Sequence, residues 1–188
     1  MTMEAAKEYT LSVLTEDKPG LLNRLTIIFS RRKINIDSLN VSSTEVKGVS
    51  RYTMVATETK EHLDKVVKQI RKLVDVLGAF VYEEDEITYR EIALYKISAE
   101  LFEKNGEVEK LIRNSGAKVV ETNQHHVFLE KTGTKEETHE LYIGLEPHGI
   151  LEFVRSGRVA ISKSMRKTEA FIKELESSRS NKLSIKDF

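Results

Sequence analysis

One segment near the amino terminus constrains the fold of this chain more than any other feature. Residues 13–41 read VLTEDKPGLLNRLTIIFSRRKINIDSLNV, which predicts a strand, a tight loop at Pro19-Gly20, an amphipathic helix and a second strand entered through Asn35. The loop delivers a helix amino terminus, whose unpaired N–H groups and positive dipole end favour a carboxylate. Gly20 has no Cβ, so a small ligand could lie directly against the backbone. No nucleophile in the segment has a base beside it, which indicates a site that holds a small acid rather than transforming it.

The composition removes several classes of protein. Thirty Lys and Arg residues balance thirty Asp and Glu residues, so no net field directs the chain to nucleic acid or to an anionic membrane. The absence of cysteine excludes disulfides, thiolate metal sites and cysteine nucleophiles, and suits a reducing compartment. The sequence has neither a signal-peptide pattern nor a run of about 18 apolar residues. We therefore expect a soluble, cytoplasmic protein.

The first half of the chain alternates strand and helix patterns. Pro19 fits an early position of the first helix, with Asp17 as a possible cap, and apolar residues from Leu63 to Val74 mark a second helix. The apolar face of the first helix is expected to contain Leu21, Leu22, Leu25, Ile28 and Phe29. Strands are expected at 8–14, 34–42, 49–58 and 77–82. The resulting order, βαββαβ, is that of the ferredoxin-like motif.

The same order recurs after an acidic run at 83–86. Four consecutive carboxylates do not converge on one point, so this run is interpreted as a solvated linker in preference to a metal site. Beyond it, strands are expected at 89–98, 118–122, 127–131, 151–154 and 158–162, and helices at 107–114 and 135–145. We predict an α+β chain with domains at 8–83 and 89–164, joined by the linker 84–88 and followed by a polar tail at 165–188, whose first part could be helical.

Five segments carry a resemblance to a known family. They are EDKPGLLNR at 16–24, FSRRKINIDSL at 29–39, QIRKLVDV at 69–76, REIALYKI at 90–97 and RSGRVAISK at 155–163. In this order they resemble the small regulatory subunit of acetolactate synthase. A Pro-Gly loop alone would indicate only an ACT-type amino-acid sensor, whereas NIDSL, KLVDV and REI together are much more diagnostic. The resemblance covers roughly residues 8–165.

The resemblance implies a fold and a function. Members of this family have an amino-terminal ACT domain and a second domain of related topology. They are not enzymes alone. They bind a large catalytic subunit that carries thiamine diphosphate, Mg²⁺ and FAD, raise its activity and confer feedback inhibition, usually by valine. Carried over to this chain, the resemblance implies a homodimer formed through the ACT domain, with no cofactor, metal site or catalytic residue of its own.

The resemblance also implies an effector site between two copies of the chain. Its residues would be Asp17, Gly20, Leu21 and Leu22 from one copy and Asn35 and Ile36 from the other. Many members have Asn where this chain has Asp17. A carboxylate there would repel the effector's own carboxylate unless it faces the ammonium group. An apolar lining favours an aliphatic side chain without separating valine from leucine or isoleucine, because one methylene is worth only about 1–3 kcal/mol.

Each of these residues also has a purely structural interpretation. Gly20 could serve only a tight turn, and Asn35 could be a left-handed residue between helix and strand. The apolar residues Leu21, Leu22 and Ile36 are expected to belong to the core first and to face a ligand second. The histidines at 125, 126, 139 and 148 do not have the spacing of metal ligands.

Other functions fit the residues less well. An RNA-binding module of the same fold needs several aromatics on its third strand, and residues 49–56 offer only Tyr52. A stand-alone ACT-type regulator of another enzyme remains the alternative, because its loop would have the same chemistry. Independent catalysis is disfavoured, since the sequence shows neither an acid–base pair nor a cofactor loop.

Overall fold

The chain passes twice between two separately packed units in the computed structural model, which describes residues 5–164, 170, 172 and 173. The first unit contains the residues up to Thr88 and those from Ala160 onward, and the second is Tyr89–Val159. The predicted second domain, 89–164, starts where this unit starts and extends past its end. Of the predicted tail, 165–188, only residues 170, 172 and 173 are described, and these are helical.

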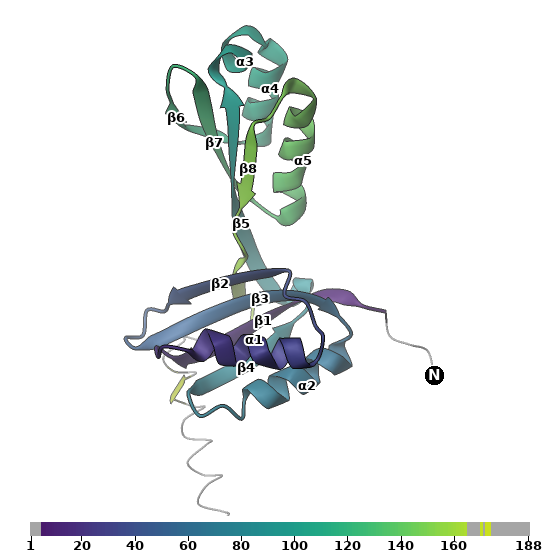
Figure 1. The fold of residues 1–188 in the computed structure, drawn as a ribbon, viewed down its shortest axis with the longest axis vertical. Helices are drawn as coiled ribbons and strands as arrows, with labels where there is room; N and C mark the ends of the chain where they lie inside the picture. Colours follow the sequence, from purple (N-terminus) through teal and green to yellow (C-terminus); the bar gives the residue numbers. More distant parts are fainter. Residues whose placement is uncertain (1–4, 165–169, 171, 174–188) are drawn as a thin grey trace, which may run out of the picture. The chain divides into compact units, whose positions relative to one another are not determined.

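The first unit is an antiparallel sheet with two helices on one face (Figure 1). The strand order across the sheet is β2-β3-β1-β4, so β2 and β4 are its edges. This is the predicted βαββαβ topology. Its elements are β1 (Lys7–Glu16), α1 (Leu21–Arg31), β2 (Ser38–Ser43), β3 (Val49–Glu58), α2 (Lys60–Ile70), β4 (Val76–Tyr82) and the 3₁₀ turn η1 (Glu84–Glu86).

Strand alternation divides the residues of this sheet between its two faces. Leu11 pairs with Met54 across β1 and β3, Val13 pairs with Tyr52, and all four pack in the same core. Because side chains two apart along a strand share a face, these residues meet the helices. The core residues that α1 contributes are Leu21, Leu25, Ile28 and Phe29.

Helix α1 differs from its prediction at its start and on one flank. The helix begins at Leu21, its cap residue is Gly20 and no side chain caps it, so the predictions of Pro19 as a helical residue and of Asp17 as the cap are both wrong. Leu22, expected in the core, is 40% exposed. It lies at the edge of the buried stripe, since the core positions of the helix are already filled at Leu21 and Leu25.

Helix α2 and strand β2 are both shorter than predicted. Helix α2 ends at Ile70, and Val74 beyond it is 81% exposed, because the chain turns there towards β4. Strand β2 begins at Ser38 instead of residue 34. The backbone N–H of Ile34 still donates to the Phe29 carbonyl at the end of α1, at 3.1 Å, and is therefore not part of a sheet.

The second unit repeats the topology of the first. Its strand order is β6-β7-β5-β8, and α4 and α5 pack on each other and share a core with one face of the sheet (Figure 1). Strand β9 also pairs with β5. The elements of the second unit are β5 (Ile87–Ser98), α3 (Ala99–Lys104), α4 (Gly106–Ser115), β6 (Lys118–Thr122), β7 (His126–Gly133), α5 (Lys135–Leu145), the 3₁₀ turn η2 (Glu146–His148) and β8 (Glu152–Arg155). Strand β9 (Val159–Ser162) belongs to the first unit from Ala160 onward.

The short helix α3 was not predicted from the sequence. Its first turn is capped by the Ser98 hydroxyl, which accepts from the Leu101 N–H at 3.1 Å. A buried tyrosine joins the sheet to α5, because the Tyr95 hydroxyl donates to the Thr138 carbonyl at 2.6 Å. Burial raises the pKa of Tyr95 to about 12, so it stays neutral and remains a donor.

An ion-pair cluster joins two of the five segments that carry the family resemblance. Glu91 from REI is buried, and its carboxylate lies 3.0 Å from Arg155 Nε and 3.7 Å from Arg158 Nε, both from RSGR. The Arg158 guanidinium also covers the Tyr89 ring at 4.0 Å. Removing one member of a buried ion cluster leaves another charge buried without a partner, which typically lowers the free energy of unfolding by about 3–5 kcal/mol.

The acidic run forms a 3₁₀ turn between β4 and β5, and residues 84–86 are exposed to solvent. Glu83 and Glu86 form a capping box around η1, in which the Glu83 N–H donates to the Glu86 carboxylate at 2.8 Å. The returning chain is attached to the same turn, because the Lys163 N–H donates to the Glu86 carbonyl at 2.9 Å. Further along, Ile172 is buried against Leu14 and Val49. The first unit is therefore completed by residues that follow the second in sequence.

Candidate functional site

The loop between β1 and α1 leaves a helix amino terminus open. Gly20 has φ of 81° and ψ of −3°, the left-handed conformation that glycine adopts without strain. No side chain caps α1, so its first-turn N–H groups lack the usual partner. A Cβ placed on Gly20 would meet no heavy atom within 4 Å. The space beside Gly20 is thus open, so a carboxylate could approach the uncapped amino terminus of α1 closely.

An aspartate from elsewhere in the sequence holds this loop. Asp75, between α2 and β4, is only 8% exposed, and its Oδ1 lies 2.9 Å from Lys18 Nζ. Its Oδ2 accepts a hydrogen bond from Arg24 Nη2. The two cations come from opposite sides of Gly20. The Glu16 N–H also donates to the Asp75 carbonyl, at 2.9 Å.

The charges of this cluster persist over a wide range of pH. Hydrogen bonds from Lys18 and then Arg24 lower the pKa of Asp75 from its ordinary 3.8. Hydrogen bonds to Glu16 and then Asp75 raise the pKa of Lys18 from its ordinary 10.5. The contribution of Asp75 to stability is present above pH 3.8 and is lost as the pH falls through its lowered pKa. The contribution of Lys18 to stability is present below pH 10.5 and is lost as the pH rises through its raised pKa.

Asp17 is exposed and turned towards β3. Its Oδ1 accepts a hydrogen bond from the Ser50 hydroxyl at 3.1 Å, and its backbone N–H donates to the Gly48 carbonyl at 2.8 Å. Burial and then the Asp17 charge raise the pKa of Tyr52. A negative charge beside the loop suits the ammonium group of an amino acid better than its carboxylate.

Asn35 lies beyond the other end of α1. Its Nδ2 donates to Asp37 Oδ1 at 3.1 Å, and Asp37 Oδ2 accepts from the Thr57 hydroxyl at 2.9 Å. The left-handed residue of this turn is Lys33, with φ of 57°, so the left-handed interpretation of Asn35 is wrong. Ile36 is partly buried against the core.

The predicted site residues do not all meet within one chain. Gly20 precedes the first turn of α1, whereas Asn35 follows its last residue, Arg31. Eleven helical residues separate them, a length of roughly 16 Å. The Leu21 side chain is fully buried, so it can offer a ligand only its backbone N–H. Asp17, Gly20 and the exposed Leu22 thus lie in one continuous segment at the start of α1, whereas Asn35 and Ile36 lie beyond its other end.

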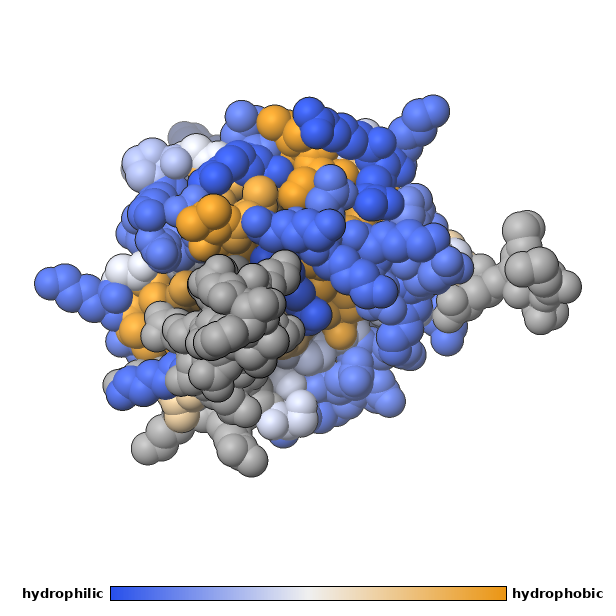
Figure 2. Space-filling view, turned by 90° about the horizontal axis from the view of Figure 1, so that it is seen from below, coloured by the Kyte–Doolittle hydropathy of each residue, from blue (hydrophilic) through white to orange (hydrophobic). Residues whose placement is uncertain are grey.

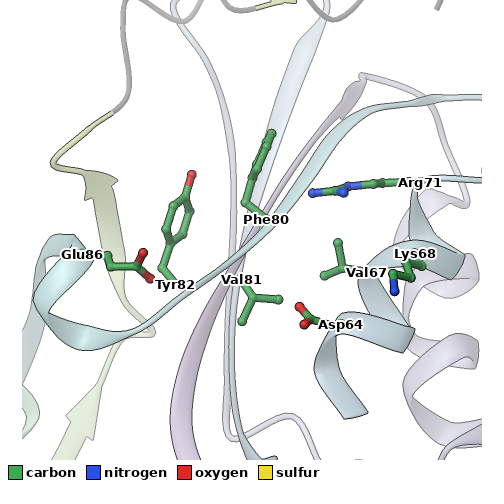
Figure 3. A pocket seen from close by; sticks show the side chains of 8 residues that line it. All are labelled: Asp64, Val67, Lys68, Arg71, Phe80, Val81, Tyr82 and Glu86. Carbon is green, nitrogen blue, oxygen red and sulfur yellow. The ribbon is translucent and has the colours of Figure 1, made fainter. Parts of the chain in front are cut away.

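A separate hollow of about 200 Å³ lies between α2 and β4, away from all six predicted site residues. Figure 3 shows Phe80 and Tyr82 projecting from one side of β4, with Val81 on the other. The Arg71 guanidinium is engaged there, since its Nε donates to the Ala79 carbonyl at 2.8 Å. It also covers the Phe80 ring at 5.5 Å. The hollow is lined by Asp64, Val67, Lys68, Arg71, Phe80, Val81, Tyr82 and Glu86.

The structure describes residues 5–164, 170, 172 and 173, and the next two statements apply to these residues alone. Among those residues, no three His, Asp or Glu side chains are grouped so that they could hold a metal ion. No helix within the same residues is both long and apolar enough to cross a membrane.

Comparison with known proteins gives consistent matches over both halves. Residues 11–78 match the model of the AHAS small subunit-like ACT domain, and residues 90–164 match that of the small subunit of acetolactate synthase. The acetolactate synthase small subunit of Mycolicibacterium smegmatis is 41% identical over 158 residues, covering 84% of this chain and 92% of its own. A protein of Archaeoglobus fulgidus named probable acetolactate synthase small subunit is 32% identical over 160 residues, covering 85% and 99%.

A solved structure agrees with these matches. The crystal structure of the acetolactate synthase small subunit from Thermotoga maritima aligns with a TM-score of 0.76 and 25% identity. The alignment covers 85% of this chain and 99% of that one.

Proposed function

Since this chain belongs to the family of acetolactate synthase small subunits, we propose that it regulates the catalytic large subunit of that enzyme. In this role it would raise the activity of the large subunit and confer feedback inhibition by a branched-chain amino acid, most simply valine. Thiamine diphosphate, Mg²⁺ and FAD would belong to the large subunit. The cytoplasmic location stays a prediction.

The open amino terminus of α1 is the observation that supports an amino-acid effector. A carboxylate placed there would accept hydrogen bonds from first-turn N–H groups at the positive end of the helix dipole. Asp17 would face the ammonium group, and the exposed part of Leu22 would contact an aliphatic side chain. This arrangement recognises the three parts of a branched-chain amino acid without a catalytic group.

A second copy of the chain would complete the site. A two-fold axis across the middle of α1 would bring Gly20 of one copy near Asn35 of the other, because an isologous contact exchanges the two ends. Two features support an interface on this side. Among the strands that the structure describes, β2 is an outer strand of its sheet, and Val41 on β2 and Leu22 on α1 are 45% and 40% exposed apolar residues.

Exposure of apolar residues is not by itself a mark of an interface in this protein. Figure 2 shows several apolar areas among charged side chains on one side of the molecule. Single exposed apolar residues are common on soluble proteins. The interface at β2 therefore needs a test in which an equally apolar residue elsewhere serves as the control.

We expect Val41→Asp to convert the dimer to a monomer and to weaken valine binding by at least tenfold. A charge on the free edge strand would be buried without a partner in the dimer, which is strongly unfavourable. Val154→Asp is the matched control, because Val154 is 55% exposed on β8 of the second unit and its replacement should leave association unchanged. Sedimentation equilibrium at micromolar concentration measures the association state of both variants, and calorimetric titration measures their valine affinity. If Val41→Asp remains a dimer with full valine affinity, the interface is not at β2.

The function itself is tested with the wild-type protein. Calorimetric titration with valine, leucine and isoleucine measures binding, and large-subunit activity with and without this chain measures activation and inhibition. We expect saturable binding of at least one of the three amino acids and an increase in large-subunit activity that the same amino acid reverses. Failure to bind any of them, together with unchanged large-subunit activity, would reject the proposed function.

A further inference from the structure

The loop that offers the open N–H groups is fixed by a residue far away in sequence. Asp75 contacts Lys18, which is 57 positions away, and Arg24, which is 51 positions away. Its side chain is 12% exposed, whereas those of Lys18 and Arg24 are 52% and 44% exposed. The aspartate is thus the buried centre of the cluster, and the two cations extend from it to the surface.

The contacts of Asp75 bracket Gly20 on both sides. Lys18 precedes Gly20 by two residues, and Arg24 follows it by four, in the first turns of α1. Each cation pairs with a different oxygen of the same carboxylate. The hydrogen bond from the Glu16 N–H to the Asp75 carbonyl also attaches the start of the loop to Asp75. The loop and the helix entrance therefore have one common anchor.

A site built from backbone N–H groups depends on the shape of the backbone. The donors of the loop cannot rotate independently, as side-chain donors can, so their directions follow from the backbone angles of the loop. Gly20 is flexible at the centre of this loop, because glycine has access to far more backbone conformations than other residues. An anchor on each side of it removes that freedom before a ligand arrives, and preorganisation of this kind increases affinity.

We propose that Asp75 is a positioning residue of the effector site, an inference that rests on the function proposed above. Asp75 does not touch the effector. It holds Lys18 and Arg24 so that the loop and the first turn of α1 present their N–H groups in the binding geometry. Asp75 affects the affinity for the effector only through the conformation of the loop.

The test is Asp75→Asn, which preserves size and removes the charge that pairs with both cations. We expect valine affinity, measured by calorimetry, to fall roughly tenfold, which corresponds to about 1.4 kcal/mol. Activation of the large subunit should stay at the wild-type level. A role in overall stability alone would instead lower activation and thermal stability together and leave the valine affinity of the folded protein unchanged. That result would overturn the inference.

The control variant is Asp64→Asn, which removes the same charge from an exposed position on α2. It should leave valine affinity unchanged. A loss in Asp64→Asn equal to that in Asp75→Asn would mean that net charge governs affinity, and would count against positioning. Amide NMR spectra without effector give a second readout. The signals of Gly20 to Asn23 should shift in Asp75→Asn and not in Asp64→Asn.

A thermodynamic cycle examines whether Asp75 acts through its two cations. In a Lys18→Met, Arg24→Met background, Asp75→Asn should produce no further loss of valine affinity, because the contacts that it removes are already absent. The same tenfold loss in that background would overturn the inference. If Asp75→Asn does not fold, Lys18→Met alone replaces it, since Arg24 then still pairs with the carboxylate. A partial loss of affinity is expected there, and an unchanged affinity would contradict the proposal.

The outcomes separate this inference from the proposed function. If the wild-type chain binds none of the three branched-chain amino acids, the proposed function is rejected, and the positioning role with it. If the wild type binds valine and Asp75→Asn binds it equally well, only the positioning role is rejected.

Discussion

Gly20→Asp should abolish feedback inhibition while leaving most of the activation of the large subunit intact. The added side chain has room, because no heavy atom lies within 4 Å of its Cβ. Its carboxylate would occupy the open helix amino terminus itself and repel the carboxylate of the effector. Allosteric coupling is typically about 1–3 kcal/mol, and an effector that does not bind contributes none of it. The measurement is large-subunit activity across a valine titration.

Gly20→Asn is the matched control for charge. Asn and Asp have nearly the same volume, and both must adopt the left-handed backbone of Gly20, which costs roughly 1–2 kcal/mol for an ordinary residue and less for these two. We expect Gly20→Asn to weaken inhibition less than Gly20→Asp. Gly116→Asn is a second control, because Gly116 in the second unit also has a left-handed backbone, with φ of 74°. It measures the cost of this backbone strain without changing the loop at Gly20. Inhibition of Gly20→Asp at the wild-type midpoint would place the site elsewhere.

The second large effect concerns the residues that return to the first unit. Ile172 is buried against Leu14 and Val49, and Leu14 is fully buried. We expect Ile172→Ala to lower the free energy of unfolding of the first unit by about 2–5 kcal/mol, the usual cost of such a truncation in a core. Urea denaturation of the full chain, followed by a probe in the first unit, measures this change. A midpoint equal to that of the wild type would mean that Ile172 contributes nothing to this core.

The same feature predicts how the chain can be divided. A fragment that ends at Thr88 lacks Ile172 and should lose at least as much stability as Ile172→Ala. A variant in which a short Gly-Ser link joins Thr88 to Ala160 retains it, and the hydrogen bond from Lys163 to Glu86 holds the two joined ends close. We expect this variant to bind valine like the full chain and to transmit inhibition poorly, because the second unit is missing.

Regular patterns made most of the fold predictable from the sequence. The ranges 49–58, 118–122 and 135–145 coincide with β3, β6 and α5 to the residue. In β3 the enrichment in β-branched and aromatic residues favours a strand, and in α5 Thr134 opens a capping box with Glu137. Helix α3 was missed because six residues are too few to show helical periodicity.

The candidate site was predictable only in part. Its location at Gly20 follows from local sequence, since a Pro-Gly loop before an apolar helix is visible without a structure. The proposed role of Asp75 could not be predicted from the sequence, because its contacts with Lys18 and Arg24 join residues more than fifty positions apart. The solvent-facing position of Leu22 also depended on tertiary packing, as it lies at the edge of an apolar stripe that extends to either side.

Arg71 has a consequence for how many copies of this chain can associate. Its guanidinium donates two hydrogen bonds to the Ala79 carbonyl on the edge strand β4. This backbone acceptor is therefore already hydrogen-bonded within the chain. A sheet with two receptive edges can add molecules without limit and grow into a fibre, whereas a sheet with one receptive edge is complete when that edge has met its copy. Pairing through β2 would therefore close at two molecules. If the homodimer proposed above forms through β2, the contact between Arg71 and Ala79 on β4 would help to limit the assembly to two molecules.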